Sequence, residues 1–308
     1  MSKIFKLIIC SFLLMQGATA QTDIDGIMMQ NNFFCIGPTV GYSSWKNYWE
    51  GTNKRNNANL GTVSTKTAII MGNFGVTDKL NLLFGLPYIK TNASAGTLQG
   101  QQGWQDLSLF VKWVAKEKSI GKGSLKGVII GGYATPVSNY SADLLPLSIG
   151  MQSKTAMLRL MADYEVGNWF ATASGTYNFR SNTTLDKSTY YTTEMHYTHE
   201  VKMPDATYFN LRAGYRSSTW IIEAIADKWT TLGGFDITKN NMPFVSNRMN
   251  ATKVGIHIKY DSDFVDGLSF VADGNTTVAG RNVGQTTSYS GGIFYILDFS
   301  KKQKEETK

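Results

Sequence analysis

The sequence predicts an all-β protein, a transmembrane antiparallel up-and-down β-barrel of about 12 strands. Three observations lead to this prediction. Large apolar residues recur at every second position in about a dozen segments, which is the period of a β-strand. Short turns alternate with longer connections along the chain, as in outer-membrane barrels. After the N-terminal apolar run, no uncharged apolar stretch reaches the ~18 residues that a membrane-spanning helix needs.

The chain begins with the pattern of a secretory signal peptide. Two lysines precede the apolar run Leu7–Met15, and the small residues Ala18 and Ala20 follow it. We therefore expect residues 1–20 to direct export and to be removed. A lipoprotein signal ending at Cys10 fits less well, because most of the apolar run follows that cysteine.

Composition narrows the classes of function. Beyond the signal peptide the only cysteine is Cys35, so no internal disulfide is possible. The formal net charge is +7, but no basic cluster stands out except Lys301–Lys304 near the C-terminus. Nucleic-acid binding therefore has no support.

The alternation of turns sets the strand count. We expect spanning strands at 33–49, 60–75, 80–92, 104–116, 125–137, 148–165, 169–181, 206–217, 219–230, 250–261, 267–280 and 287–299. The strand-like stretch Ser188–Val201 is placed inside a long outer loop, because a thirteenth strand would upset the alternation. An even count puts both ends of the barrel, 33–299, at the periplasmic side. Residues 21–32 then form a short periplasmic segment, and residues 300–308 form a polar tail.

The height of the aromatic residues distinguishes a membrane barrel from a secreted, soluble β-sandwich, which would show the same alternation. On this topology several aromatic residues on the outward face fall at the periplasmic ends of their strands: Trp113, Tyr164, Trp169, Tyr215, Trp220 and Tyr260. This arrangement is an interfacial aromatic girdle. We therefore expect outward residues such as Leu82 and Phe84 to face lipid, in the outer membrane of a Gram-negative-type bacterium, and the sheet to close on itself.

Two stretches resemble a known family. Asn73–Tyr88 (NFGVTDKLNLLFGLPY) resembles a hairpin of the outer-membrane transporter-like proteins labelled for the meta-pathway of phenol degradation, and Gly103–Lys112 (GWQDLSLFVK) resembles their next strand, with Gln105 in place of a glycine. The resemblance implies a β-barrel channel for small, often hydrophobic compounds.

The last predicted strand also carries a resemblance. Gly291–Phe299 alternates apolar residues and closes on an aromatic, which is similar to the C-terminal signal that the outer-membrane assembly machinery reads. We expect this machinery, outer-membrane lipid and a small-molecule solute as partners of a monomeric barrel.

The candidate site is the set of charged and polar residues on the inward parity: Asp106, Lys112, Arg159, Asp163, Arg180, Arg212, Arg216, Glu223, Asp227, Lys253, His257, Lys259 and Asp273. Two interpretations remain open. In one, opposite charges pair and fill the lumen. In the other, the basic members line a narrow pore that favours anionic or polar solutes.

Catalytic patterns are weak. His196 and His199 lie near Glu194 and Glu200 in the long outer loop, but histidine spacing alone is poor support for a metal site. His257 has Lys259 two residues later, where a phospholipase-type barrel would carry a hydroxyl. We predict no enzyme activity, cofactor or metal. The predicted function is an outer-membrane channel for passive uptake of small, hydrophobic or anionic solutes; the alternative is a non-transporting structural or enzymatic barrel.

Overall fold

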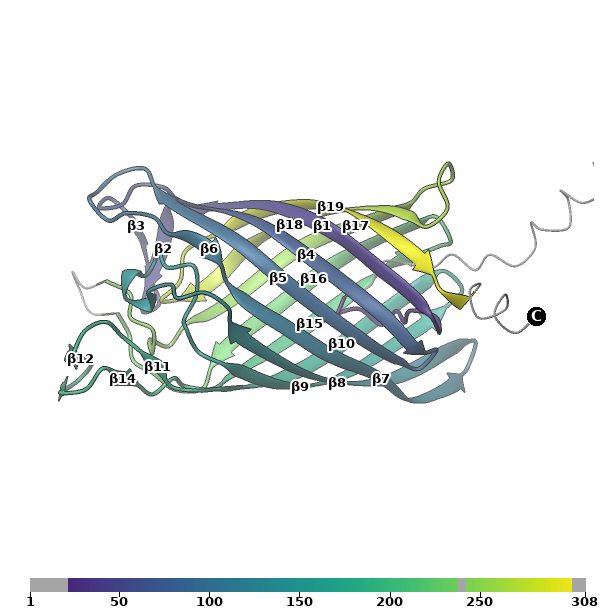
Figure 1. The fold of residues 1–308 in the computed structure, drawn as a ribbon, viewed down its shortest axis with the longest axis horizontal. Coiled ribbons are helices and arrows are strands. Elements are labelled where there is room, and N and C mark those ends of the chain that lie inside the picture. The colour runs from purple at the N-terminus through teal and green to yellow at the C-terminus, as the bar shows by residue number, and fades with distance from the viewer. Residues whose placement is uncertain (1–21, 238–241, 301–308) are drawn as a thin grey trace, which may run out of the picture.

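The computed structural model describes residues 22–237 and 242–300, and its main element is a closed β-barrel (Figure 1). The predicted signal peptide, 1–20, and all but the first residue of the predicted tail lie outside the described residues. The barrel strands are β1 (Phe33–Trp45), β4 (Val63–Thr77), β5 (Leu80–Ala93), β7 (Asp106–Ile120), β8 (Gly123–Pro136), β9 (Thr155–Val166), β10 (Trp169–Arg180), β15 (Ala206–Arg216), β16 (Trp220–Thr231), β17 (Asn250–Asp261), β18 (Leu268–Arg281) and β19 (Thr287–Asp298). The prediction of a 12-stranded all-β barrel is confirmed.

The sheet closes between its first and last strands. β19 pairs antiparallel with β1 from Phe33 opposite Asp298 to Ser44 opposite Thr287, and every other long strand pairs with its neighbours along the chain. The short strand β6 (Gln102–Trp104) pairs antiparallel with the outer end of β5. Closure leaves no unpaired strand edge, which a sheet in lipid requires.

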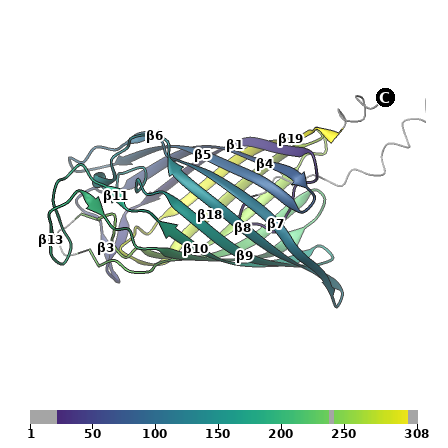
Figure 2. The ribbon, with the colours of Figure 1, turned by 60° about the horizontal axis from the view of Figure 1, so that its bottom comes forward.

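Short turns lie at one end of the barrel and long connections at the other (Figures 1 and 2). The connection between β10 and β15 contains two small hairpins, β11 (Thr183–Thr184) with β14 (Glu200–Val201) and β12 (Tyr190–Tyr191) with β13 (Met195–His196). These hairpins lie outside the barrel sheet, so the stretch 188–201 belongs to an outer loop, as predicted. A further hairpin, β2 (Asn47–Glu50) with β3 (Asn53–Asn56), follows β1.

Three predicted strands extend three or more residues too far at their outer ends. β1 stops at Trp45 rather than at residue 49, β4 starts at Val63 rather than at residue 60, and β9 starts at Thr155 rather than at residue 148. The reason is a loop core, in which the fully buried Leu147 packs with Leu60 and Val63. This packing draws the chain before β9, which includes the 3₁₀ turn η1 (Ala142–Leu144), away from the sheet.

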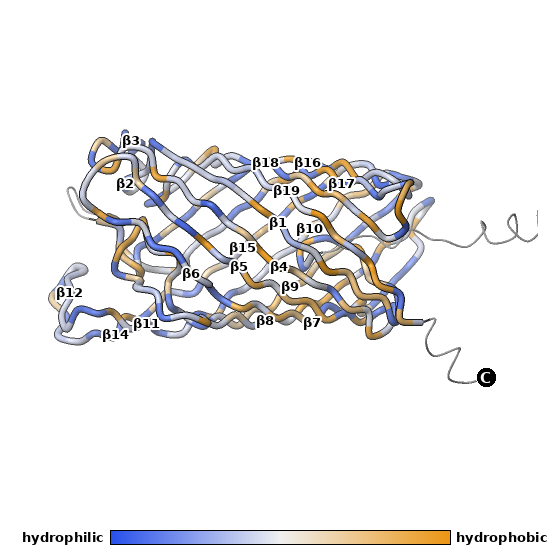
Figure 3. Tube along the Cα trace, turned by 45° about the horizontal axis from the view of Figure 1, so that its top comes forward, coloured by the Kyte–Doolittle hydropathy of each residue, from blue (hydrophilic) through white to orange (hydrophobic). Residues whose placement is uncertain are grey.

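The outer surface of the barrel is apolar, with aromatic residues at the periplasmic end. Apolar and polar residues alternate along the strands (Figure 3). Trp169 meets Tyr215 with ring centroids 5.6 Å apart, and Trp220 meets Tyr260 at 4.7 Å. Such a surface matches lipid and its interfaces, so the protein is an outer-membrane barrel. No helix in the described part of the chain is long and apolar enough to cross a membrane.

The outer loops pack on one another. A buried apolar cluster joins the connections β8–β9, β10–β15 and β16–β17; its members are Ala142, Leu145, Leu185, Val201, Met203 and Val245. These three outer connections are therefore held together by apolar packing, and we call these residues the outer loop cluster.

Candidate functional site in the lumen

The strand register places all of the predicted charged residues on inward positions of the wall. Burial follows the same parity: the Lys112 and Asp163 side chains are fully buried, whereas Leu160 and Trp169 on outward positions are 59% and 68% exposed. The lumen is thus lined by ionisable groups in a space largely closed to solvent. Such groups need partners within the protein.

The N-terminal segment Thr22–Gln30 supplies many of these partners. The Lys112 ammonium donates to the Thr22 carbonyl at 2.9 Å, to the Asp25 carboxylate at 3.0 Å and to the Ile27 carbonyl at 2.7 Å. Three acceptors use all three donors of an ammonium group. The sequence predicted a short periplasmic segment here; in the structure it lies inside the barrel, because the lumen offers buried cations that require acceptors.

Arg159 is bound by the same segment. Its guanidinium donates to the Asp23 carbonyl at 2.6 Å and to the Asp23 carboxylate at 2.7 Å, while its Nε–H donates to the Thr176 hydroxyl at 2.7 Å. The strongest candidate for attracting an anion from solution is therefore already neutralised by a carboxylate of the chain.

Asp25 is fixed as an anion. Burial by itself would raise the pKa of its carboxyl, but the Lys112 ammonium and hydrogen bonds from Thr22 outweigh this effect, so that the pKa lies below its usual value. The Ile27 amide also donates to this carboxylate at 2.9 Å. The segment thus carries negative charge into the lumen.

The other arginines of the lumen are also paired. Arg212 donates to Glu223 in a buried ion pair. Arg216 is bound to Glu165, lies 3.5 Å from the Asp163 carboxylate and stacks over the Phe170 ring at 3.9 Å. A free basic ladder is therefore absent from the described residues of the lumen.

The remaining predicted residues form local pairs on the wall. At the outer end, Arg180 donates to the Pro204 carbonyl at 2.6 Å. The other hydrogen-bonded pairs are Tyr140 with Asp106 at 2.7 Å, Tyr208 with Asp227 at 2.5 Å, His257 with Asp273 at 2.7 Å and Lys259 with Asp261 at 2.5 Å. Lys253 is half-buried opposite Asp227 in the register.

Two glycines make room for the segment. A Cβ at Gly26 would lie 2.1 Å from the Asp163 side chain, and one at Gly75 on β4 would lie 2.0 Å from the Gln30 carbonyl. Neither distance is possible for a real side chain. The sequence therefore contains the small residues that the inserted position requires.

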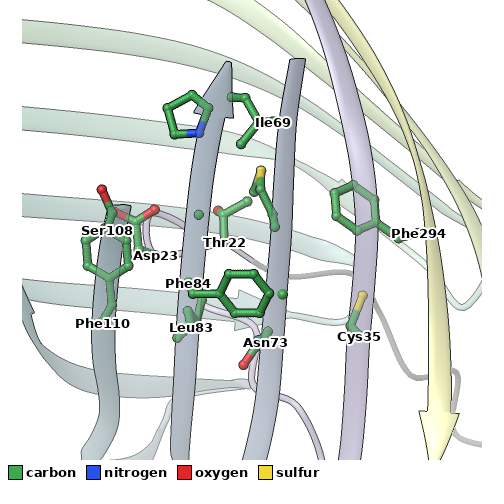
Figure 4. A pocket seen from close by; sticks show the side chains of 14 residues that line it. Thr22, Asp23, Cys35, Ile69, Asn73, Leu83, Phe84, Ser108, Phe110 and Phe294 are labelled. Atoms are coloured by element: carbon green, nitrogen blue, oxygen red, sulfur yellow. The ribbon is translucent and has the colours of Figure 1, made fainter. Parts of the chain in front are cut away.

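The inserted segment leaves two small cavities. The first has a volume of about 210 Å³ and is mainly apolar; Figure 4 shows Ile69, Leu83, Phe110 and Phe294 around it, with Asp23 at its side. The second has a volume of about 200 Å³, and its lining includes Asp25, Arg212, Glu223 and His257. The space inside the barrel thus offers one apolar and one charged compartment.

Asp23 and Asp25 are not among the site residues that the sequence predicts. Both stand in TDIDG, directly after the predicted cleavage site, and neither lies in a periodic segment. A signal was present: the predicted lumen set contains seven lysines and arginines but five carboxylates, which indicates that further acceptors come from elsewhere in the chain. The predicted loop histidine His196 stacks on Tyr190 with ring centroids 4.7 Å apart and forms a hydrogen bond with the Thr192 hydroxyl. No metal-binding cluster occurs in the described residues.

Fold and site together define the class: an outer-membrane β-barrel whose lumen holds its own N-terminal segment. Among solved structures, the chain is similar to the COG4313 outer membrane channel from Pseudomonas putida F1, with a TM-score of 0.69, 13% identity, and coverage of 91% of this chain and 100% of that chain. It also matches the translocator domain of the autotransporter NalP from Neisseria meningitidis, with a TM-score of 0.47, 15% identity, and coverage of 89% of this chain and 90% of that chain. At these identities the similarity concerns the fold.

Comparison with models of protein families gives no match, and comparison with curated protein sequences gives none either. The solved structure of the outer membrane channel supports the fold of a β-barrel, whereas transport and the label for phenol degradation stay predictions.

Proposed function

We propose that the protein is a narrow outer-membrane channel for passive uptake of small, mainly apolar solutes, in which Thr22–Gln30 acts as a plug. The observation that carries this proposal is how the plug is held. Its contacts with Lys112 and Arg159 are hydrogen bonds and ion pairs to two carboxylates, which can be broken and reformed without unfolding the wall. The solved structure with the highest TM-score quoted above is described as an outer membrane channel, which supports the same class.

The cavities favour an apolar solute over an anion. Apolar cavities of ~150 Å³ can hold a benzene-sized molecule, so the apolar cavity of about 210 Å³ has room for a single-ring compound. An anion would instead need unpaired cations, but Arg159 and Lys112 are neutralised by Asp23 and Asp25. The hydrophobic member of the two predicted solute classes is therefore the better supported.

Conductance across a planar bilayer tests the plug. The change is Asp23→Asn with Asp25→Asn, which removes both carboxylates and leaves the wall intact. We expect the open time to rise at least about tenfold, because tenfold corresponds to ~1.4 kcal/mol and each hydrogen bond to a charged group contributes more than that. The freed Arg159 and Lys112 should also give the open state a preference for anions.

A matched control removes two carboxylates outside the lumen. Asp263→Asn with Asp266→Asn alters the exposed turn after β17 and should leave conductance unchanged. If neither the unmodified chain nor the plug variant conducts, the alternative holds: the barrel does not transport, and the filled lumen is its permanent state.

The solute class is tested by calorimetric titration with phenol and with benzoate. Gly85→Leu should abolish phenol binding, because the position lines the apolar cavity and an added Cβ there meets only the Met71 Cγ, 4.0 Å away. Gly131→Leu adds the same side chain at an outward position with open space around it and should leave binding intact. Binding of benzoate but not phenol would contradict the apolar solute class.

A further inference from the structure

Lysines on the outward face of the barrel have an uneven distribution. In the outer halves of the described barrel strands, outward positions carry Lys66 on β4, Lys90 on β5 and Lys228 on β16. All three are exposed, and the described residues give none of them an ion-pair partner. A lysine in contact with lipid is costly near the midplane and is tolerated only close to the interface.

Two of these lysines are neighbours. Lys66 lies directly opposite Lys90, and Tyr42 and Tyr289 continue the same row across β1 and β19. Since neighbouring strands are ~4.8 Å apart, the row spans about 15 Å. Figure 1 shows these four strands side by side. Like charges opposite one another are destabilising, so this pair is placed where a bound anion would relieve the repulsion.

A groove runs beside the row. It has a volume of about 650 Å³, and its lining is mainly apolar. The next row towards the midplane consists of Gly291, Val40, Ala68 and Tyr88, directly opposite one another in the register. Because Gly291 and Ala68 are small, the outer surface of the wall is recessed on both sides of Val40. The groove thus continues from the lysines into the part of the surface that faces acyl chains.

We propose that this surface binds one phosphorylated glycolipid of the outer leaflet, with a headgroup phosphate between Lys66 and Lys90 and an acyl chain in the groove over Ala68. Charge complementarity identifies the headgroup, since two unpaired ammonium groups on adjacent strands match a phosphate. The apolar groove identifies a lipid rather than free phosphate, because an inorganic ion would leave the groove without an occupant. The rings of Tyr42 and Tyr289, which continue the lysine row on one side, and of Tyr88 in the next row suit the interface between headgroups and chains.

Native mass spectrometry of the full-length protein in detergent, titrated with bisphosphorylated lipid A, tests the proposal. Lys66→Gln with Lys90→Gln should weaken retention of the lipid about 30-fold, since each basic residue near an acidic lipid surface contributes about fivefold. Lys228→Gln removes a lone lysine at the same end of the barrel and should weaken it by no more than about twofold. Dephosphorylated lipid A should bind the unmodified protein about as weakly as the double variant binds the phosphorylated lipid.

A second variant probes the groove while the charges remain. Ala68→Trp fills the groove and should also reduce retention, although both lysines are present. The resistance of each variant to SDS without heating shows that the barrel is folded. Equal retention by the double lysine variant and the Lys228 variant, or equal binding of the two forms of lipid A, would overturn the proposal, as would undiminished retention by Ala68→Trp.

Discussion

Single side chains in the lumen are held by partners from distant parts of the chain. Lys112 is buried, and the burial of an ammonium group is tolerable only because three oxygen atoms of the N-terminal segment surround it. Arg212 and Glu223 are likewise buried together, 7% and 2% exposed. At such sites the removal of one partner matters more than the net contribution of the pair, because the other is left as an uncompensated charge.

Arg212→Ala should therefore destabilise the barrel by about 3–5 kcal/mol, because Glu223 loses its cation in a buried site. The matched control is Arg55→Ala, which removes the exposed member of a pair with the half-buried Glu50 and should cost no more than ~1 kcal/mol, because Glu50 stays in contact with water. Urea titration of the folded, SDS-resistant form would measure both. The double variant Arg212→Met with Glu223→Leu should recover most of the loss. Equal midpoints for the two single variants would show that the buried pair has no such role.

At the scale of elements, the N-terminal segment lies in the lumen and the outer loops pack on one another at the outer end of the barrel. The connection β16–β17 is joined to the wall through Asp236, which accepts from Arg281 on β18 at 2.6 and 2.7 Å and from Asn282 at 2.7 Å. Hydrogen bonds from Arg281 lower the pKa of Asp236 to about 2. This contact connects the loop to a strand end, and the outer loop cluster supplies its apolar packing.

The attachment of this loop should depend on pH in the acid range. The pKa of Asp236 in the folded protein is below the ordinary 3.8. Its contribution to the stability of the loop attachment is therefore fully present above about pH 4 and is lost as the pH falls through 2. Pepsin should therefore cut within the segment from Leu232 to Met249 faster at pH 2 than at pH 4. Asp236→Asn should allow cleavage at both values. Asp186→Asn, in a different outer loop, serves as the control; pH-independent cleavage of the unmodified loop would contradict the role of Asp236.

For the whole molecule, closure and orientation are linked. The pairing of β19 with β1 and the even number of strands bring both ends of the barrel to the side of the short turns, where the Phe299 amide donates to the Asn32 carbonyl at 2.9 Å. In bacterial single-chain barrels this is the periplasmic side. The long connections then face the cell exterior.

Orientation and closure can be checked together. The unboiled protein should migrate faster than the boiled protein in SDS, because a closed barrel stays compact until heated, and it should behave as a monomer. Protease added to intact cells should cut the connection at residues 181–205 and spare the Asp78–Lys79 turn. Cleavage of that turn at the cell surface, or identical migration with and without boiling, would reverse the assignment.

Much of the fold was determined by the sequence itself. The period of two along segments such as Leu80–Leu86, the height of Trp113 and Trp169, and the alternation of turns are local properties. Each depends on which solvent a side chain meets, and the chain encodes this position by position. The predicted strand 250–261 has the bounds of β17, and the predicted strand 169–181 ends one residue beyond β10. Outer strand ends were less predictable, since Leu147 ends the sheet through contacts with Leu60 and Val63, not through its own neighbours.

The content of the lumen was decided only by the tertiary structure. The inward parity of Lys112 and Arg159 follows from the sequence, but their partners Asp25 and Asp23 lie 87 and 136 residues away along the chain. The segment Thr22–Gln30 forms neither a strand nor a helix. Its sequence therefore shows no hydrophobic period from which its position in the lumen could be predicted. It lies in the barrel since buried cations there need acceptors and Gly26 and Gly75 leave space. The match between the cations of the wall and the carboxylates of the segment exists only once the barrel has closed.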